Sequence, residues 1–385
     1  MNKEEALTHF HQVVLEPAIH HALLNLRSYV VEHSEKLIQA FVESIRQLCI
    51  QAKIDQEQQG KSSVAFLHCS MLRMSLVNGS YACLLEAYSE SWYWDGIGCF
   101  HEYDATWAFA PLNKLQESLF GDMKRYGGKL NASDAERLIL QAAGRFNAFV
   151  VAIARMAVPH ILALQEMQAL DRSDRFQIRV GEYKDWSEPV HIREGDHRII
   201  QHIRKKLSGA DGLENAYGNY TSLSLPEGSF DHVDVRYPDF SDADFRKCSF
   251  RNSVLIGTKW HQSNLSETDL RGSVLTDASF QGCNLKGANL SETSDGGNGD
   301  GFATTALGIQ GISFERANLE NADLRGANLA QADFKEANLT GAQVWLHDRE
   351  KYEDLWSDEQ RASVRWVVLP TREDKEERWS SNITN

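Results

Sequence analysis

No apolar run in this 385-residue chain is both long and uninterrupted. The most apolar stretch, residues 146–164, contains Asn147, Arg155, Pro159 and His160, and polar groups of this kind are costly inside a lipid bilayer. The stretch therefore predicts a buried helix and excludes a membrane span. The N-terminus also lacks the pattern of a cleavable signal sequence, and we expect a cytoplasmic protein.

Cysteine motifs and catalytic motifs are absent as well. The six cysteines show no C-x-x-C spacing, which is typical of reduced thiols. The signatures of serine hydrolases, zinc peptidases, phosphate loops and dinucleotide-binding folds are missing. Two groups lack the paired short spacings of zinc ligands: His9, His11, His20 and His21, and Cys83, Cys99 and His101. We expect no metal, no cofactor and no enzymatic activity.

The composition describes a soluble globular chain, with 42% apolar residues, 24% charged residues and a net charge of −14. Its length predicts two domains. Residues 1–170 predict a mainly α-helical domain. One helix has an apolar face formed by Leu37, Ile38, Phe41, Val42, Ile45, Leu48 and Cys49. Further helices are expected over 65–77, 81–88, 112–126 and 138–156, the last preceded by a capping box of Ser133 and Glu136.

Residues 171–217 are predicted to connect this domain to the next part of the chain. They contain a short alternating strand over 176–180 and a helix over 197–207, and the Gly-, Asp- and Asn-rich segment 209–219 predicts the boundary.

Aromatic and acidic residues alternate in one segment of the helical domain. Such a mixture could form a cage for a cationic ligand or a basic peptide. The alternative is a loop whose rings pack on the helices and whose acids face water. The candidate residues are Trp92, Trp94, Asp95, His101, Glu102 and Asp104.

An apolar residue returns every five positions from Phe230 to Val344, and residues 317–339 repeat A(D/N)(L/F)xx without a slip. A period of five fits neither a helix nor a strand, so it predicts a solenoid whose units stack around one core. The large residue fills this core, and the Asn or Asp before it favours a turn. Predicted core residues are Phe245, Phe250, Leu265, Leu270, Phe280, Leu319, Leu324 and Phe334.

These tandem motifs resemble the bacterial pentapeptide-repeat proteins. The resemblance implies a right-handed, four-sided parallel β-helix with four pentapeptides per coil, here over residues 218–345. The fold class is therefore expected to be α+β: a helical domain, the β-helix, and a short helical cap and tail over 346–385. In the cap, Tyr352, Leu355 and Trp356 either cover the last coil or mediate a homodimer.

The repeat loses its register once. Leu290 and Phe314 are 24 residues apart, one short of a multiple of five. We predict an inserted loop near 291–308 that projects from the rod and contacts a partner, with the register recovered near Ile309. The loop lacks the motifs of phosphate and calcium loops. Its candidate residues are Asp295, Gly296, Gly297, Asn298, Gly299, Asp300 and Gly301.

Within this family, the Qnr and MfpA proteins resemble B-form DNA in size and negative charge and bind DNA gyrase. Residues 226–345 contain 17 acidic and 10 basic residues. At the two turn positions after each core residue from Phe230 onward, however, 8 acids stand against 9 bases, whereas a DNA mimic should present dense negative charge.

We therefore rank three functions. First is a non-catalytic interaction or scaffold protein with a protein partner and no direct contact with nucleic acid or membrane. Second is a DNA-mimicking gyrase binder that protects topoisomerase from inhibitors. Third is a helical domain that binds a ligand or acts as an enzyme.

Overall fold

The computed structural model describes residues 2–193, 217–296 and 307–369. The chain divides into two compact units, one of Met1–His197 with Asp300–Ile309 and one of Arg198–Gly299 with Gln310–Asn385. Each has a hydrophobic core of its own. The helix expected over 197–207, most of the boundary expected over 209–219 and the C-terminal tail lie outside the described residues.

The first unit is built on a five-stranded sheet. Its strands are β1 (Val64–Met71), β2 (Ala82–Tyr88), β3 (Phe100–Asp104), β4 (Arg172–Glu182) and β5 (Ser187–Ile192), in the order β3-β2-β1-β4-β5. β1 and β4 are parallel, and the other neighbours are antiparallel. The strand predicted over 176–180 lies within β4. Because β4 and β5 complete this sheet, residues 172–192 belong to the first unit, and their description as a connecting segment is wrong.

β1 and β2 also correct the helices expected over 65–77 and 81–88. In β1, Leu67, Cys69 and Met71 join the core shared with the helices, while the residues between them point to the other face of the sheet. This alternation has the period of two that is typical of a strand. The short helix α3 (Arg73–Val77) occupies only the end of the first segment.

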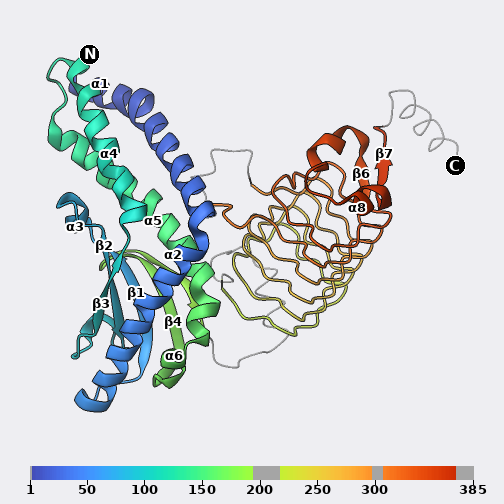
Figure 1. Ribbon diagram of the computed structural model, residues 1–385, viewed down its shortest axis with the longest axis horizontal. Helices are drawn as coiled ribbons and strands as arrows, with labels where there is room; N and C mark the ends of the chain where they lie inside the picture. The colour runs from blue at the N-terminus through green and yellow to red at the C-terminus, as the bar shows by residue number, and fades with distance from the viewer. Residues whose placement is uncertain (1, 194–216, 297–306, 370–385) are drawn as a thin grey trace. The chain divides into compact units, whose positions relative to one another are not determined.

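Helices cover one face of the sheet. One continuous helical stretch begins the chain and consists of α1 (Lys3–Phe10), the π-helical turn η1 (His11–Leu15) and α2 (Glu16–Gln59). The later helices are α4 (Thr106–Met123), α5 (Ala132–Ala163) and α6 (Gln165–Ala169). Two 3₁₀ turns, η2 (Trp92–Trp94) and η3 (Lys124–Tyr126), precede and follow α4. α2 packs against β2, β3 and α5, and α5 packs against α4, β4 and β5 (Figure 1). The predicted apolar face of α2 is largely buried, including Leu37, Phe41, Ile45 and Leu48.

α5 begins earlier than its predicted cap. Asn131 is the N-cap, and its side-chain oxygen accepts a hydrogen bond from the backbone N–H of Asp134 at 3.0 Å. The Asp134 carboxylate accepts in return from the Asn131 N–H at 3.1 Å. The capping box is therefore formed by Asn131 and Asp134, and its predicted position at Ser133 and Glu136 is wrong, because Asn131 is the last residue with an extended backbone before the helix.

α5 is the one described helix whose length and composition would allow it to cross a membrane. Phe146, Phe149, Val150 and Ile161 on this helix are all buried in the core of the first unit. The helix therefore has the burial of a core helix, as predicted for residues 146–164.

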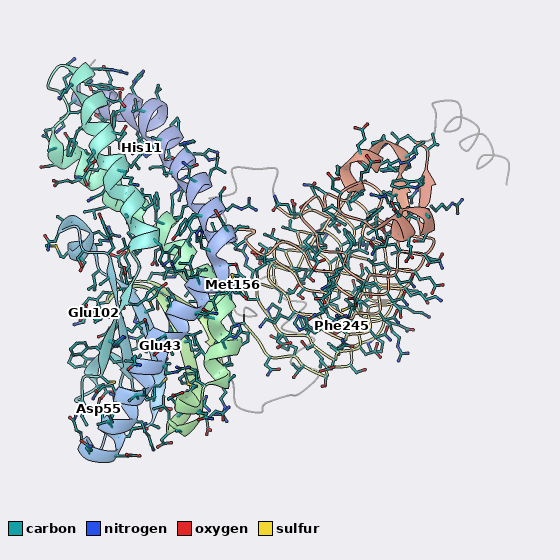
Figure 2. The ribbon with its side chains drawn as sticks, viewed as in Figure 1. His11, Glu43, Asp55, Glu102, Met156 and Phe245 are labelled. Carbon is teal, nitrogen blue, oxygen red and sulfur yellow. The ribbon has the colours of Figure 1, made fainter. Side chains whose placement is uncertain are left out.

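The second unit is a solenoid of parallel bridges. Asn219 bridges Asp239, Asp239 bridges Lys259 and Lys259 bridges Ser279, a constant spacing of 20 residues or four pentapeptides per coil. All eight predicted core residues, Phe245 among them (Figure 2), are at most 1% exposed. The sequence period thus corresponds to one bridge per five residues, with every large apolar residue in the core.

The inserted segment lengthens a single coil. Ser279 bridges Ser313, 34 residues later rather than 20, after which the regular spacing returns. The core stack is continuous across the insertion, because the rings of Phe280 and Phe314 lie parallel with centroids 5.2 Å apart. Regular bridging thus resumes at Ser313 rather than near Ile309.

A cap closes the C-terminal end of the rod. It contains β6 (Gln343–Trp345) parallel to β7 (Arg365–Val367), the 3₁₀ helix η5 (Leu346–Tyr352) and α8 (Asp358–Ser363). Tyr352 and Trp356 stack 4.5 Å apart, and the edge of Trp356 meets Phe334 at 5.5 Å. The Tyr352 hydroxyl donates to the Ala327 carbonyl at 2.9 Å, and Leu355 packs beside them.

The burial of Tyr352 and Trp356 distinguishes the two roles predicted for this segment, a cap on the last coil and a homodimer interface. Trp356 is only 3% exposed, so it has no free surface with which to form a homodimer. Its contacts are those of a cap, which shields the last coil from edge-to-edge association.

We predict that Trp356→Ala destabilises the rod by about 3–5 kcal/mol, the usual cost of removing a buried tryptophan. Urea denaturation of the full-length protein, followed by circular dichroism, measures the change. Trp94→Ala is the matched control, because Trp94 is 91% exposed and its loss should leave stability unchanged. Equal stability of the two variants would contradict the assignment of Trp356 to the cap.

Candidate functional site

The rod presents charged side chains in its turns, and the stacking of coils pairs them. Asp231 and Arg251, one coil apart, approach to 2.6 Å, and Arg316 and Glu336, also one coil apart, to 2.7 Å. All six arginines in the described part of the rod have a carboxylate partner: Arg236, Arg246, Arg251, Arg271, Arg316 and Arg325. The acidic residues of this surface are therefore partly neutralised.

Asp231 shows how these pairs act on the carboxylates. Burial alone would raise the pKa of Asp231, but hydrogen bonds from Arg251 and Ser249 outweigh it and lower the pKa. The carboxylate is thus charged at neutral pH, and its charge is directed to residues of the same rod rather than to a partner.

The inserted loop is only partly described, and Gly297, Asn298, Gly299, Asp300 and Gly301 lie outside the described residues. Asp295 is held in the coil, because its carbonyl accepts from Thr276 Oγ1 at 2.8 Å and its carboxylate from Asn328 Nδ2 at 3.1 Å.

The far end of the loop groups with the first unit. There, Leu307 and Ile309 pack on its core, and Arg27 donates to the Leu307 and Gly308 carbonyls. Both described ends of the loop are thus held by contacts within the chain, and partner contact by the loop remains a prediction.

In the first unit, the predicted aromatic and acidic residues are not brought together as one cluster. Asp95 anchors its own segment: its carboxylate accepts from Lys61 Nζ at 2.8 Å and from the backbone N–H groups of Ser89 and Ile97 at 2.7 and 3.1 Å. Burial would raise the pKa of Asp95, but these hydrogen bonds outweigh it and lower the pKa. The carboxylate therefore organises the loop over residues 89–97.

This anchored loop places Trp92 on the sheet face that the helices leave uncovered. The Trp92 ring lies 3.8 Å from the Phe66 ring and 5.8 Å from the His68 ring, measured between centroids. Trp92 also has a positive φ of 53°, a backbone conformation that is unfavourable for a bulky residue and is often associated with function.

Strand register defines the floor beneath Trp92. Phe100 lies opposite Glu86, Glu86 opposite His68, and His68 opposite Arg179, so the four side chains form one row on one face. His68 and Glu86 were not identified in the sequence. The alternation of Phe66, His68 and Ser70 with core residues was the available signal, and it was obscured because the segment was assigned to a helix.

His68 and Glu86 have perturbed protonation and unpaired atoms. Burial, with a smaller effect of Arg179, lowers the pKa of His68 to about 4, so the imidazole is neutral at pH 7. Burial raises the pKa of Glu86, against the opposing effects of Tyr88 and Lys184. Among the described residues, His68 Nε2 and Glu86 Oε2 are buried without a hydrogen-bond partner, which is uncommon in native proteins.

The other predicted residues occupy several positions. Trp94 points to solvent. Glu102 on β3 (Figure 2) lies opposite Leu84, on the same face as Glu86. Asp104 accepts from the backbone N–H of Thr106, the first residue of α4, at 2.9 Å. His101 lies opposite Leu85 and thus on the other face of the sheet.

Metal chemistry finds no support in the part of the chain that the structure describes. No group of three or more His, Cys, Asp or Glu residues there is arranged to hold a metal ion. All six cysteines are buried free thiols. Burial raises the pKa of Cys283 to about 12, which keeps this thiol protonated and unreactive.

Comparison with known proteins identifies the repeats. Residues 261–292 and 312–344 match the family model for pentapeptide repeats, with 8 copies. No curated protein matches the chain.

Solved structures with similarity to the chain include three of relevance. A pentapeptide repeat protein, Rfr23, from the cyanobacterium Cyanothece 51142 is 22% identical, with a TM-score of 0.21, over 40% of this chain and 93% of that one. QnrB1, a plasmid-mediated fluoroquinolone resistance protein, is 13% identical, with a TM-score of 0.15, over 43% of this chain and 85% of that one. A pentapeptide repeat protein of the Arabidopsis thaliana thylakoid lumen is 22% identical, with a TM-score of 0.14, over 35% of this chain and 78% of that one.

We predict that Lys61→Met destabilises the first unit by about 3–5 kcal/mol, because it leaves the Asp95 carboxylate buried without its cation. The side chains of Lys61 and Asp95 are 0% and 8% exposed. Urea denaturation of the full-length protein measures the loss. The double variant Lys61→Met/Asp95→Asn should recover most of it, and failure to recover would show that the ion pair is not the origin of the effect.

Proposed function

We propose that the pentapeptide-repeat segment of this chain is a right-handed, four-sided β-helix that acts as a rigid, non-catalytic surface for a protein partner. The observation that carries this proposal is the pairing of charged turn residues on a solenoid whose core positions are filled in every coil. A rod of this kind presents its side chains in a fixed pattern and loses little conformational entropy on binding.

The same ion pairs disfavour the gyrase alternative. A DNA mimic would present carboxylates at a density near that of DNA phosphates, about one charge per 1.7 Å of axis. Here Asp269, Asp323 and Glu336 each share their charge with an arginine. Binding of DNA gyrase is therefore the second candidate.

One side of the rod is suited to a protein contact. Val254 and Val274 bridge each other and are the only apolar residues at the described bridging positions outside the named strands. In the turns of the same side, the rings of Tyr217 and Tyr237 stack 5.2 Å apart. Apolar and aromatic residues on an otherwise polar surface are characteristic of the centre of an interface. We name this surface, formed by Tyr217, Tyr237, Val254 and Val274, the valine side.

The free thiols also support a cytoplasmic location, which we include in the proposal. Six buried cysteines without a disulfide are typical of proteins in a reducing compartment.

To test the valine side, full-length protein is immobilised and exposed to a lysate of its source organism. We expect a partner that is retained by the unaltered protein and at least tenfold less by Val254→Glu/Val274→Glu, because two charges then face an apolar interface. The control Ser224→Glu/Ser229→Glu adds the same charge at exposed bridging positions on other sides and should retain the partner. Equal retention by all three proteins would contradict the proposal.

Gyrase supercoiling separates the two candidates. We expect no effect of micromolar full-length protein, with or without a fluoroquinolone, because ion pairs neutralise part of the rod's acidic surface. Inhibition of supercoiling, or its restoration in the presence of the drug, would instead place gyrase first.

A further inference from the structure

We propose that a cavity between α3, α4 and α5 binds a short segment of a partner protein that carries a valine, leucine or isoleucine side chain beside a lysine or arginine. We call this cavity, which has a volume of about 40 Å³, the α3 pocket. Its apolar and aromatic lining consists of Leu76, Val77, Tyr81, Leu112, Ile139 and Leu140. The proposal concerns the first unit alone, so it can fail while the proposed function of the rod holds, and the reverse is equally true.

The floor of the α3 pocket is apolar and belongs to the core of the first unit. Leu76, Leu112 and Ile139 are buried, and they come from α3, α4 and α5 respectively. Tyr81 and Leu140 pack against the same core as partly buried walls. Because a packed core supports these side chains, the pocket is formed before a ligand arrives, and an aliphatic group that enters it is removed from water.

The volume of the pocket restricts the side chain that can enter. An apolar cavity that binds benzene has a volume of roughly 150 Å³, so the α3 pocket, at about 40 Å³, is too small for an aromatic ring. The end of a branched aliphatic side chain is smaller, which makes valine, leucine and isoleucine the fitting residues. Insertion of single aliphatic side chains into such hollows is a common mode by which proteins recognise a partner segment.

Exposed apolar residues extend the surface at the mouth of the pocket. Val77 lines the pocket and is 51% exposed. Met74 lies three residues earlier, on the same side of α3, and is also exposed. Exposed methionine is frequent on surfaces that bind protein segments, because its flexible side chain adapts to the partner. The mouth thus offers apolar contact to the residues on either side of the inserted side chain.

Two carboxylates at the mouth favour a cationic partner. Glu136 lines the pocket. Glu117 lies near Tyr81, because its charge adds to the larger effect of burial in raising the pKa of the Tyr81 phenol. Both glutamates are exposed, and neither forms an ion pair within the part of the chain that the structure describes. Their charge is complementary to a lysine or arginine of the partner.

The cations of the surrounding helices are directed away from the pocket. Arg73 on α3 donates to a carboxylate on β4 at 2.8 Å. On α5, Arg137 Nη2 lies 3.9 Å from Asp134 Oδ1. Lys114 follows Leu112 by two residues, which is about 200° around α4, and it therefore lies on the opposite side of that helix from the pocket. The charge at the mouth is thus left for a cation of the partner.

The test uses full-length protein and three short fluorescein-labelled peptides at about 0.15 M salt, with binding followed by fluorescence anisotropy. The first peptide has one leucine between two lysines in a background of glycine and serine, and we expect it to bind saturably. Serine replaces the leucine in the second peptide, and tryptophan replaces it in the third. Both should bind at least tenfold more weakly, because serine leaves the pocket unfilled and the indole ring is too large for it.

Matched variants locate the binding site. Val77→Lys should weaken binding of the leucine peptide at least tenfold, because a cation then lies at the mouth of the pocket. Val13→Lys adds the same charge at a valine of η1 that is 57% exposed, and it should bind as the unaltered protein does. Glu136→Gln should weaken binding several-fold, whereas Glu35→Gln, which removes an exposed acid on α2, should not.

Leu140→Phe separates a loss of binding from a loss of folding. Leu140 lines the pocket, so the added volume of the ring should fill it, prevent binding of the leucine peptide, and leave the melting temperature unchanged or raise it. The proposal is overturned if the leucine peptide does not bind, if either of the other peptides binds as tightly, or if Val77→Lys and Val13→Lys have the same effect.

Discussion

The rod depends on one repeated interaction, the stacking of each core side chain on its counterpart one coil away. Phe240, Trp260, Phe280, Phe314 and Phe334 form one such stack through consecutive coils. This stack constrains what the chain can insert, because a longer coil must return its next large residue to the same column. The cap follows the same rule: Trp356 meets the last ring of the stack and covers it.

Stacking of the core also determines the surface. Residues that are 20 apart in sequence become neighbours along the rod, so an acid and an arginine separated by one coil form an ion pair, as Asp231 and Arg251 do. Exposed pairs of this kind contribute little to stability. They also neutralise part of the acidic surface of the rod, which makes that surface less like the dense negative charge of DNA.

The first unit uses a different principle. Its sheet has one face buried under α2 and α5 and another that carries polar and aromatic side chains beneath an anchored loop. Two polar atoms on this face, His68 Nε2 and Glu86 Oε2, have no hydrogen-bond partner among the described residues, and the large core on the other side of the sheet offsets the stability that they cost. The two units thus differ in how their exposed side chains are arranged: by coil stacking in the rod and by strand register in the sheet.

The sequence by itself determined the repeats, because a five-residue period leaves one arrangement in which Leu324 and Phe334 can both be buried. The sequence also predicted the apolar face of α2. Only the tertiary structure decided the first unit. Short segments such as 65–71 have an apolar content compatible with a helix or a strand, and pairing of β1 with β4, about 110 residues away, selects the strand. The row of Phe100, Glu86, His68 and Arg179 exists only through that long-range pairing, which local sequence patterns do not record.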